Sequence, residues 1–342
     1  MRPRDVKGEG KGGAKILGVE STAHTFGVAI MDEEINILAD VRRVMPFLRG
    51  KGIHPHEAAE HHAKVAHLTL RLALSEAGIG VRDLDGIAYS AGPGLGPSLR
   101  VGATVVRTLA AYLGKPLYPV HHGLGHIELA VRMTDVTDPL VVLVSGGHTA
   151  ITGFSAGRWR MYGETLDITL GNLLDQFARK VGLSGGPEGG PAVEKAAERG
   201  DRMIDLPYTV KGNNVVYSGL LTHALKLVGR ERLEDLCYSL QETAFAMLTE
   251  ATERAFVQMG KREIVLAGGV APNKRLQAMM DSMARGHGSR LHLLEKRYHP
   301  DNGVQIALVG LYHHNLGLSV EAEDAMVRQR WRLDEVEIPW RK

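Results

Sequence analysis

The chain has 342 residues, of which 44% are hydrophobic, and its formal net charge is +2. This length and composition allow a sizeable buried core and predict about two domains. The only cysteine, Cys237, excludes a disulfide framework and a thiolate metal cluster, and it suits a reducing compartment. The sequence holds no apolar run near the length of a membrane span and no signal-peptide pattern, so we expect a cytoplasmic protein without a membrane partner. The weak net charge permits a polyanionic partner without requiring one.

The N-terminal residues 1–14 are rich in lysine, arginine and glycine and hold few apolar side chains, which predicts a flexible basic tail. Residues 15–20 and 25–31 have the apolar composition of two buried strands and predict a β-hairpin. Its polar tip, residues 20–24, is typical of a hairpin turn, although such a tip could also approach a phosphate.

A glycine-rich loop joins a predicted strand to a predicted helix in the next part of the chain. Residues 54–78 have helical spacing of apolar side chains, with Pro55 in the first turn, and residues 84–90 predict a strand. The loop at residues 91–98 then leads into a helix at residues 99–113. A strand, a glycine-rich loop and a helix in this order offer free backbone N–H groups to an anion, but many other α/β connections share the pattern.

Two histidines, His122 and His126, stand four residues apart. On a helix this spacing places both imidazoles on one face, where they could share a metal ion. Two partly buried, hydrogen-bonded histidines are the alternative interpretation. Gly123 occupies the position at which a zinc protease has its general-base glutamate. A metal ion at this pair would therefore hold a substrate rather than catalyse peptide hydrolysis.

Two almost wholly apolar segments, residues 140–144 and 263–267, predict central strands covered on both faces. Each is followed by a glycine pair, at residues 146–147 and 268–269. Glycine pairs at the end of a central strand let backbone amides reach a phosphate, so the two turns predict a nucleotide held between them. The sequence has neither a Walker A motif nor a G-x-G-x-x-G motif after a strand, which argues against a P-loop or a Rossmann dinucleotide site.

Two further helices are predicted in the C-terminal half. Residues 233–259 predict a long amphipathic helix that packs on the second sheet. Asp301 precedes an apolar helix predicted at residues 304–311. The local pattern alone favours Asp301 as the N-cap of that helix over a metal ligand.

Besides His122 and His126, short motifs lie at residues 18–25, 92–95, 99–102, 145–149, 171–175, 189–194, 217–222, 268–273 and 301–303. In this order they resemble the catalytic subunit of the tRNA threonylcarbamoyladenosine transferases. The resemblance covers nearly everything from Ile16 to Trp340, and no single motif carries it. The Ser-Gly-Leu-Leu-Thr form at residues 218–222 and the Arg-Leu-Asp-Glu-Val tail at residues 332–336 are similar to the archaeal and eukaryotic branch, which works inside the KEOPS complex.

The resemblance implies a fold and a reaction. The fold is α/β, actin-like and sugar-kinase-like, with two lobes around a nucleotide cleft. Residues 15–137 and 315–342 would form the first lobe, and residues 138–314 the second. The reaction transfers the threonylcarbamoyl group of threonylcarbamoyl-AMP to the exocyclic amine of the adenosine beside the anticodon, in tRNAs that read codons beginning with adenine.

The resemblance also implies site residues and partners. One divalent metal ion, iron or zinc, would be held by His122, His126 and Asp301, and Glu20 would be catalytic together with the two histidines. The residues implied in binding the adenine nucleotide, which is threonylcarbamoyl-AMP, ATP or AMP, are Leu143, Val144, Ser145, Gly146, Gly147, Asp175, Gly190, Glu194 and Asn273. The implied partners are tRNA, a small Bud-type kinase with the other KEOPS subunits, and a threonylcarbamoyl-AMP synthase that supplies the substrate.

The chain departs from the family pattern at three places. Residues 123–125, between the two histidines, lack the acidic residue that some relatives have there. Leu143 stands where archaeal relatives often have tyrosine, so a tyrosine ligand is not available there. A Gly-Pro-Glu insertion before Gly189 lengthens the loop that would face the nucleotide.

Other functions remain open on the sequence. A sugar kinase or ATPase of the same fold, a regulatory nucleotide-binding subunit of a kinase complex, and a metalloprotease are the alternatives. We also expect modest, salt-dependent contacts with tRNA phosphates from basic residues, among them Arg100, Arg107, Arg328, Arg330 and Arg332.

Overall fold

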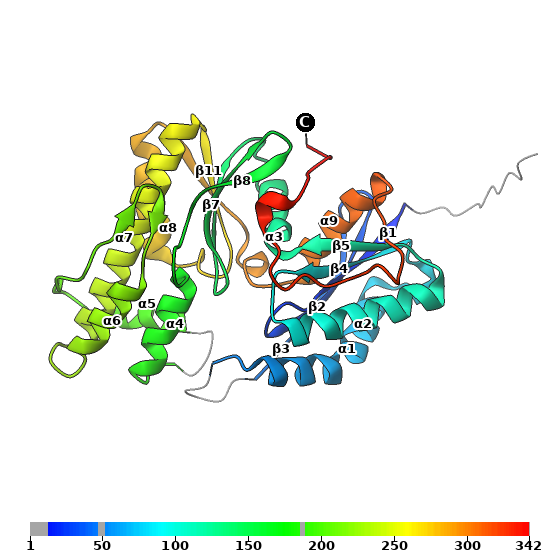
Figure 1. The fold of residues 1–342 in the computed structure, drawn as a ribbon, viewed down its shortest axis with the longest axis horizontal. Helices are drawn as coiled ribbons and strands as arrows, with labels where there is room; N and C mark the ends of the chain where they lie inside the picture. Colours follow the sequence, from blue (N-terminus) through cyan, green and yellow to red (C-terminus); the bar gives the residue numbers. More distant parts are fainter. Residues whose placement is uncertain (1–12, 47–51, 185–188, 342) are drawn as a thin grey trace, which may run out of the picture.

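The computed structural model describes residues 13–46, 52–184 and 189–341. They form two halves, each built on a five-stranded sheet (Figure 1). The predicted tail lies outside the described residues except for Gly13 and Ala14, and the insertion before Gly189 lies outside them as well. Among the described residues, no helix combines the length and the apolar character that a membrane crossing needs.

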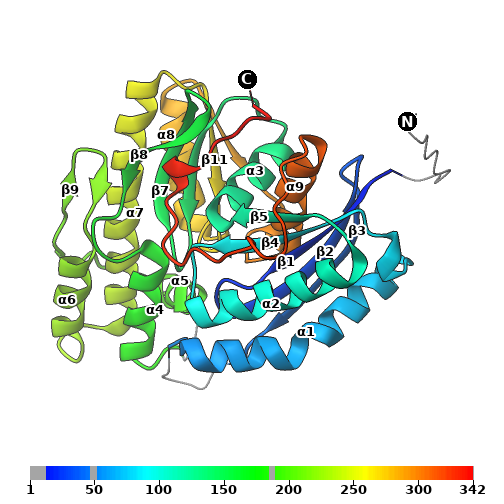
Figure 2. The ribbon, with the colours of Figure 1, turned by 45° about the vertical axis from the view of Figure 1, so that its right-hand side comes forward.

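The first sheet has the strand order β3-β2-β1-β4-β5. Its strands are β1 (Lys15–Glu20), β2 (Thr25–Asp32), β3 (Ile37–Val44), β4 (Gly86–Gly92) and β5 (Leu117–His121). The predicted hairpin is confirmed, because β1 pairs antiparallel with β2, and β1 pairs parallel with β4. Helices α1 (Pro55–Ala77) and α2 (Gly96–Leu113) cover one face, as Figure 2 shows. Helices α3 (His122–Thr134) and α9 (Gly303–Asn315) lie on the other face.

The second sheet has the strand order β12-β11-β6-β7-β8. Its strands are β6 (Leu140–Val144), β7 (Thr149–Ser155), β8 (Arg158–Glu164), β11 (Glu263–Ala267) and β12 (Arg290–Leu293). The two predicted central strands, β6 and β11, are confirmed and lie side by side in parallel. Helices α4 (Leu170–Lys180), α5 (Gly189–Ala197), α6 (Ser218–Leu227), α7 (Leu233–Met259) and α8 (Lys274–Gly286) belong to this half. Short elements complete it, namely β9 (Val210–Lys211) and β10 (Asn214–Val215).

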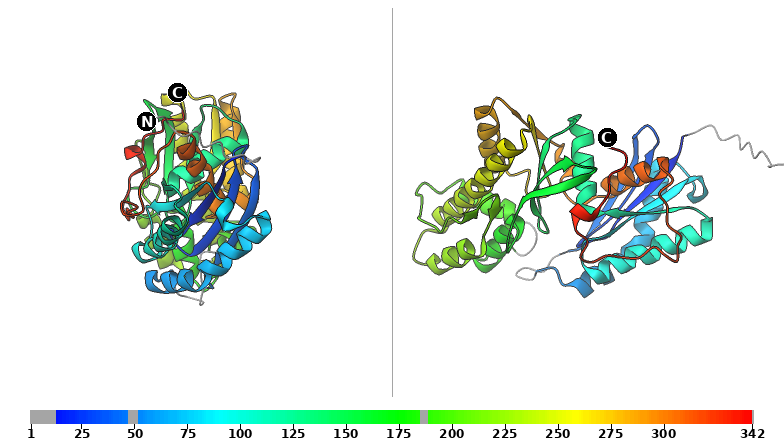
Figure 3. Two further views of the ribbon diagram at one scale, coloured as in Figure 1. Left: turned by 90° about the vertical axis from the view of Figure 1, so that its right-hand side faces the viewer. Right: turned by 45° about the horizontal axis from the view of Figure 1, so that its top comes forward.

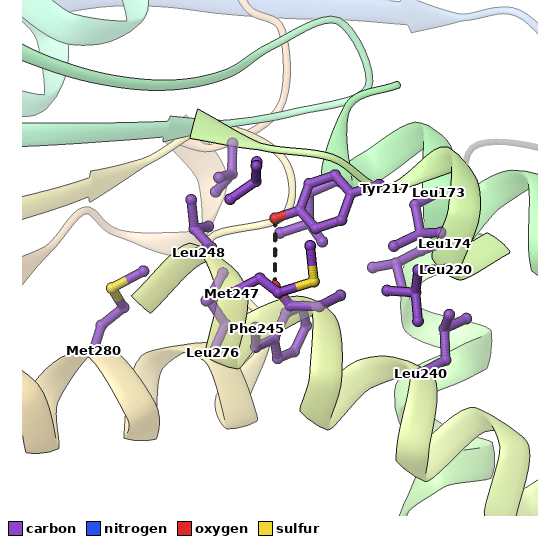
Figure 4. Close-up of a cluster of buried hydrophobic side chains, with 14 of the residues drawn as sticks. Leu173, Leu174, Tyr217, Leu220, Leu240, Phe245, Met247, Leu248, Leu276 and Met280 are labelled. Carbon is purple, nitrogen blue, oxygen red and sulfur yellow. Dashed lines mark hydrogen bonds between the residues drawn. The ribbon is translucent and has the colours of Figure 1, made fainter. Parts of the chain in front are cut away.

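The side chains of β6 alternate between two hydrophobic cores. Val142 and Val144 join the core beneath α4 to α8, whereas Val141 and Leu143 face the core that contains α3 and α9. A strand with apolar residues on both faces needs cover on both sides, which explains the uninterrupted apolar run in the sequence. Figure 4 shows the first of these cores, in which the buried Tyr217 hydroxyl donates a hydrogen bond to the Ala244 carbonyl over 3.3 Å.

Helix α3 lies between the two sheets, as the right-hand view of Figure 3 shows. Leu124 and Ile127 of α3 share one core with Val141 of β6, Val265 of β11 and Val304 of α9. Apolar contact on both sides of α3 therefore joins the two halves, and the residues at its N-terminus lie between them.

Helix α9 packs against the first sheet. A Cβ added at Gly18 of β1 would lie 2.3 Å from the Ala307 nitrogen, and a Cβ added at Gly303 would lie 2.4 Å from the Ala29 nitrogen. The predicted lobe boundary after residue 314 places α9 in the second lobe, whereas its contacts are with the first sheet. We propose a division that follows the packing, with α9 joined to residues 15–137.

The chain after α9 returns across both halves (Figure 2). Val320 forms a β-bridge with Leu117 beside the first sheet, and Ile338 donates a backbone hydrogen bond to Gly157 in the turn between β7 and β8. This segment therefore contacts both sheets, whereas the resemblance implied that residues 315–342 belong to the first lobe.

Candidate metal centre and flanking loops

The predicted histidine pair lies on the first turns of α3. His122 is the first residue of the helix, and His121 caps it by accepting a hydrogen bond from the Leu124 N–H at its Nδ1, over 3.1 Å. The rings of His122 and His126 are 4.8 Å apart at their centroids, and both side chains are buried. The spacing of four residues therefore places both imidazoles on one helical face, as predicted.

Asp301 meets this pair from the segment before α9. Its Oδ1 lies 3.5 Å from His122 Nε2 and 3.2 Å from His126 Nε2. Two ligands of one tetrahedral zinc ion, each bound at about 2.1 Å, are about 3.4 Å apart. The ligand atoms of the three residues lie within 4.8 Å of one another, so the set fits a divalent metal ion.

The interpretation of Asp301 as an N-cap is wrong. Asn302 caps α9, and its Oδ1 accepts the Gln305 N–H over 2.9 Å. The Asn302 amide also donates to the carbonyl of Pro300 over 2.8 Å, which fixes the turn that carries Asp301. With the cap supplied by the next residue, the Asp301 carboxylate is directed to the histidines.

Glu20, at the end of β1, contacts the Nδ1 side of the His122 ring, whereas Asp301 lies on the Nε2 side. The Glu20 Oε2 lies 2.9 Å from His122 Nδ1, while its Oε1 accepts hydrogen bonds from the N–H and the hydroxyl of Thr22. A histidine that donates Nδ1–H to a carboxylate presents Nε2 as the free ligand atom, which is the arrangement of metal-binding histidines. Glu20 therefore fits the centre as a positioning residue rather than as a ligand.

The charge at the centre favours a cation. Burial alone would lower the pKa of His122, but Glu20 and Asp301 outweigh burial and raise that pKa to about 9. Burial would also raise the pKa of Asp301, whereas His122 and His126 hold it well below its ordinary range. Two carboxylates thus stabilise positive charge at the imidazoles, and a divalent ion supplies that charge while leaving the imidazoles neutral.

Two residues of the centre were not singled out from the sequence. The His148 ring stacks on His122 with centroids 6.0 Å apart, and burial together with the nearby histidines lowers the pKa of His148 to about 3. Its Nδ1 is buried without a hydrogen-bond partner. Gln305 Nε2 lies 3.3 Å from His122 Nδ1. His148 stands in a recognised motif, so a signal existed, but nothing near Gln305 in the sequence indicates this contact.

The loop of residues 145–149 leaves β6 beside the centre. Ser145 Oγ accepts hydrogen bonds from the N–H groups of Gly147 and His148 over 3.2 and 3.0 Å. Gly146 and Gly147 are exposed, and nothing lies within 4 Å of a Cβ added at either. Leu143 and Val144, by contrast, are buried strand residues. Leu143 and Val144 therefore contribute side chains to the hydrophobic cores, and the exposed backbone of the segment begins at Gly146.

The second glycine pair lies directly beside the first. Val270 donates its N–H to the Val144 carbonyl over 3.0 Å. Gly268 has a φ of +94°, and a Cβ there would lie 2.4 Å from the same carbonyl oxygen. The two glycine turns therefore adjoin, as expected for parallel neighbouring strands, and Gly268 is required by both conformation and space.

The remaining residues implied in nucleotide binding surround the starts of α5 and α8. Burial raises the pKa of Asp175 to about 6, against the hydrogen bonds from the Gly190 and Gly189 N–H groups. Glu194 Oε1 accepts the Lys274 N–H over 2.8 Å. Asn273 caps α8 through its Oδ1 and donates to Gln241 Oε1 over 2.9 Å. Glu194 and Asn273 thus both lie at the start of α8, where their side chains form hydrogen bonds within the protein.

Two backbone amides of the glycine-rich loop before α2 are bonded within the protein and are not free for an anion. The Gly94 N–H donates to the Gln329 carbonyl over 3.3 Å, and the Leu95 N–H donates to the Thr22 carbonyl over 2.8 Å. The C-terminal segment and Thr22 therefore occupy two of the amides that the sequence offered to an anion.

A sequence model of the tRNA N6-adenosine threonylcarbamoyltransferases matches residues 37–308. The chain belongs to this family. The transferase of Caldivirga maquilingensis is 52% identical over 328 residues, which are 95% of this chain and 98% of that protein. The transferase of Thermofilum pendens is 50% identical over 329 residues, which are 96% of this chain and 97% of that protein.

Solved structures share the fold of the transferase at low identity. HypF of T. kodakarensis has a TM-score of 0.62 at 15% identity, over 92% of this chain and 49% of that chain. The activator of the 2-hydroxyisocaproyl-CoA dehydratase from Clostridium difficile has a TM-score of 0.56 at 10% identity, over 89% and 97% of the two chains. The fold is therefore the predicted α/β fold of the actin-like, sugar-kinase-like type.

The family resemblance seen in the sequence is confirmed, and the chain is a transferase that modifies tRNA. The alternatives of a kinase, an ATPase or a regulatory subunit are not favoured. The structure brings the three expected metal ligands together, with Glu20 directly behind them. The implied roles of these residues in catalysis stay predictions.

Proposed function

We propose that the transferase moves the threonylcarbamoyl group from threonylcarbamoyl-AMP to the exocyclic amine of the adenosine beside the anticodon, in tRNAs that read codons beginning with adenine. The amine nitrogen attacks the carbamoyl carbonyl carbon, the bond from that carbon to the AMP phosphate oxygen breaks, and the amine loses one proton. Because AMP is already a good leaving group, the protein needs to position the reactants and stabilise the developing oxyanion, and it needs no nucleophilic side chain.

His122, His126 and Asp301 are the residues that would hold one iron or zinc ion. When bound, such an ion supplies a Lewis acid with open positions for substrate oxygens. Glu20 keeps His122 oriented through the 2.9 Å bond to Nδ1, and Thr22 fixes Glu20 in turn. These contacts support the proposal that Glu20, His122 and His126 act as one catalytic unit.

The glycine turns support a nucleotide site beside this centre. Their exposed backbone, at Gly146 and Gly147, suits an approach to phosphate, and Asp175 could accept hydrogen bonds from ribose hydroxyls. Leu143 and Val144 would contribute through the strand that carries the turn. Gly190, Glu194 and Asn273 would contribute by holding the starts of α5 and α8. The dehydratase activator, which shares the fold, was solved with bound ADPNP, and this supports an adenine nucleotide here.

One observation carries the proposal, namely that the loop of residues 145–149 contacts both parts of the site. At one end His148 stacks on the candidate ligand His122. At the other end, the Thr169 hydroxyl donates to the Gly146 carbonyl over 2.7 Å, and a Cβ at Gly171 would lie 2.6 Å from the Ser145 oxygen. The nucleotide part of threonylcarbamoyl-AMP, bound at this loop, would therefore lie between the metal centre and α4. Its threonylcarbamoyl group could then reach the metal.

Mass spectrometry of nucleosides tests the reaction. The transferase is incubated with threonylcarbamoyl-AMP and a tRNA that reads a codon beginning with adenine, with and without the presumed partner subunits. We expect threonylcarbamoyladenosine in the digested tRNA. A matched tRNA with guanosine beside the anticodon should stay unmodified. Unmodified tRNA in the complete reaction, or steady ATP consumption with a sugar and without tRNA, would contradict the proposal.

We further propose that the transferase works in the cytoplasm with a small Bud-type kinase and the other KEOPS subunits, and that a threonylcarbamoyl-AMP synthase supplies its substrate. The sequence forms at residues 218–222 and 332–336 support this branch of the family. The single thiol, Cys237, is free and buried, as suits a reducing compartment. Co-purification with the tagged transferase tests the assembly, and recovery of the transferase alone would contradict it.

A further inference from the structure

The C-terminal strap, defined here as residues 326–332, lies on the loop that precedes α2. Arg328 donates its N–H to the Ala91 carbonyl over 2.7 Å. At Gly92, which has a φ of +151°, an added Cβ would lie 1.9 Å from the Arg328 carbonyl oxygen. The glycines of this loop therefore make room for the strap, which fixes the position of the strap on the first half.

The strap also contacts the start of the metal-binding helix. His121 Nε2 lies 3.1 Å from the Trp331 carbonyl oxygen, and the two rings are 5.2 Å apart at their centroids. His121 directly precedes the candidate ligand His122. The strap thus contacts the residue that directly precedes a candidate metal ligand.

Three arginines lie where the strap crosses α2, and a fourth, Arg330, follows Gln329 on the strap itself. Arg100 and Gln329 both approach Gly96, while Arg107 and Arg328 both act on the Tyr89 hydroxyl, which donates to the Met326 carbonyl over 3.1 Å. The four residues are Arg100, Arg107, Arg328 and Arg330, and all but the half-buried Arg107 are exposed.

None of these four arginines forms an ion pair with a carboxylate in the part of the chain that the structure describes. Arg332 differs, because its guanidinium binds both oxygens of Asp334 over 3.0 and 3.2 Å. In a chain whose net charge is only +2, four guanidinium groups without a carboxylate partner on the strap and on α2 add positive charge to this part of the molecule. Such a surface attracts a polyanion, and each planar guanidinium can donate two hydrogen bonds to the oxygens of one phosphate.

We propose that Arg100, Arg107, Arg328 and Arg330 dock the tRNA phosphate backbone and thereby bring the target adenosine to the metal centre. This inference rests on the proposed function, since it names the surface that receives the tRNA substrate. The sequence also predicted phosphate contacts for Arg332, but its guanidinium binds Asp334, so Arg332 is not part of the proposed surface. Phosphate contacts position a nucleic acid without reading its sequence, so this surface controls the affinity for tRNA and leaves the chemical step unchanged.

The experiment measures tRNA binding and transfer by the full chain carrying Arg100→Gln together with Arg330→Gln. Each phosphate contact contributes about 0.7 to 0.9 to the slope of log affinity against log salt concentration. The double variant should therefore reduce that slope by about 1.5 and weaken binding by on the order of tenfold or more at low salt. In the transfer assay KM for tRNA should rise while kcat stays near that of the parent.

Arg230→Gln is the control for the loss of an exposed charge elsewhere, because Arg230 is exposed and lies in the turn between α6 and α7, far along the chain from the strap. Its salt slope should equal that of the parent. Circular dichroism and metal content confirm that each variant is folded and loaded. If the parent modifies tRNA and the double variant keeps the parent's slope and KM, the docking surface is refuted while the proposed function stands. If the parent does not modify tRNA, the proposed function itself fails.

Discussion

The metal centre and the glycine turns beside it are built in opposite ways. At the metal centre, buried side chains hold one another, with Glu20 on His122 and Asp301 on both histidines. At the turns, the backbone supplies the surface, and Gly146 and Gly147 are exposed. The difference indicates which changes each region tolerates. A change of one ligand atom should damage the metal centre, whereas in the turns an added methyl group should be damaging only at Gly268, where the Val144 carbonyl leaves no room for it.

Asp301→Asn should have the largest effect on function. The substitution keeps the shape of the side chain but removes the charge that faces His122 and His126, and changes even outside the ligand shell commonly cost metal affinity about 10- to 100-fold. We expect metal content and transfer to fall by on the order of a hundredfold or more. Because Asn302 supplies the cap of α9, the helix should stay intact by circular dichroism.

Elemental analysis of the purified Asp301→Asn protein measures this effect, with His126→Ala as a second variant that removes a ligand. A full metal complement in Asp301→Asn would refute the three-residue centre.

Gly268→Ala tests the turns. The new Cβ would lie 2.4 Å from the Val144 carbonyl oxygen, at a φ of +94°. We expect a loss of about 2–4 kcal/mol in the free energy of unfolding, measured by denaturant titration. Gly269→Ala is the matched control, because nothing lies within 4 Å of a Cβ there, and its stability should change little. Equal losses in both variants would show that the close approach at Gly268 is not the cause.

Glu20→Gln separates positioning from ligation at the metal centre. The amide keeps its size but accepts the His122 proton more weakly, so metal affinity or transfer should fall about 10- to 100-fold while some metal is retained. Competition with a chelator measures the affinity. An unchanged affinity would show that the contact between Glu20 and His122 does not orient the ligand.

Glu128→Gln serves as the control for Glu20→Gln. Glu128 is also buried, lies on the same helix as the ligands, and accepts hydrogen bonds from Trp159, Trp340 and Arg341. Its replacement should cost about 1–3 kcal/mol of stability by weakening these bonds, and it should leave metal affinity unchanged.

Asn273→Ala should have the smallest effect. The substitution removes the N-cap of α8 and the bond to Gln241, at a cost of about 1 kcal/mol in the free energy of unfolding. Asn273→Asp, which keeps a capping oxygen, should restore most of that stability. Thermal melting compares the two variants, and failure of Asn273→Asp to recover stability would show that the cap is not the source of the loss.

Local sequence patterns predicted the strands and helices with the strongest apolar periodicity. Helix α1 was expected at residues 54–78 and spans Pro55–Ala77, and the long helix α7 has the expected bounds, Leu233–Met259. The histidine pair on one face of α3 follows from the same helical periodicity. These features depend on neighbours a few residues apart, so the sequence alone contains the information that determines them.

Tertiary structure decided the roles that depend on distant partners. Asp301 contacts His126 across 175 residues of chain, and its local pattern favoured a cap that Asn302 provides instead. The loop before α2 has the pattern of an anion site, yet its amides bind Thr22 and the returning strap. The N-terminus of α8 uses Asn273 and Glu194 for its own hydrogen bonds. In each case a polar group can satisfy its hydrogen bonds with a ligand or with another part of the chain, and only the packing of distant segments determines which partner it has.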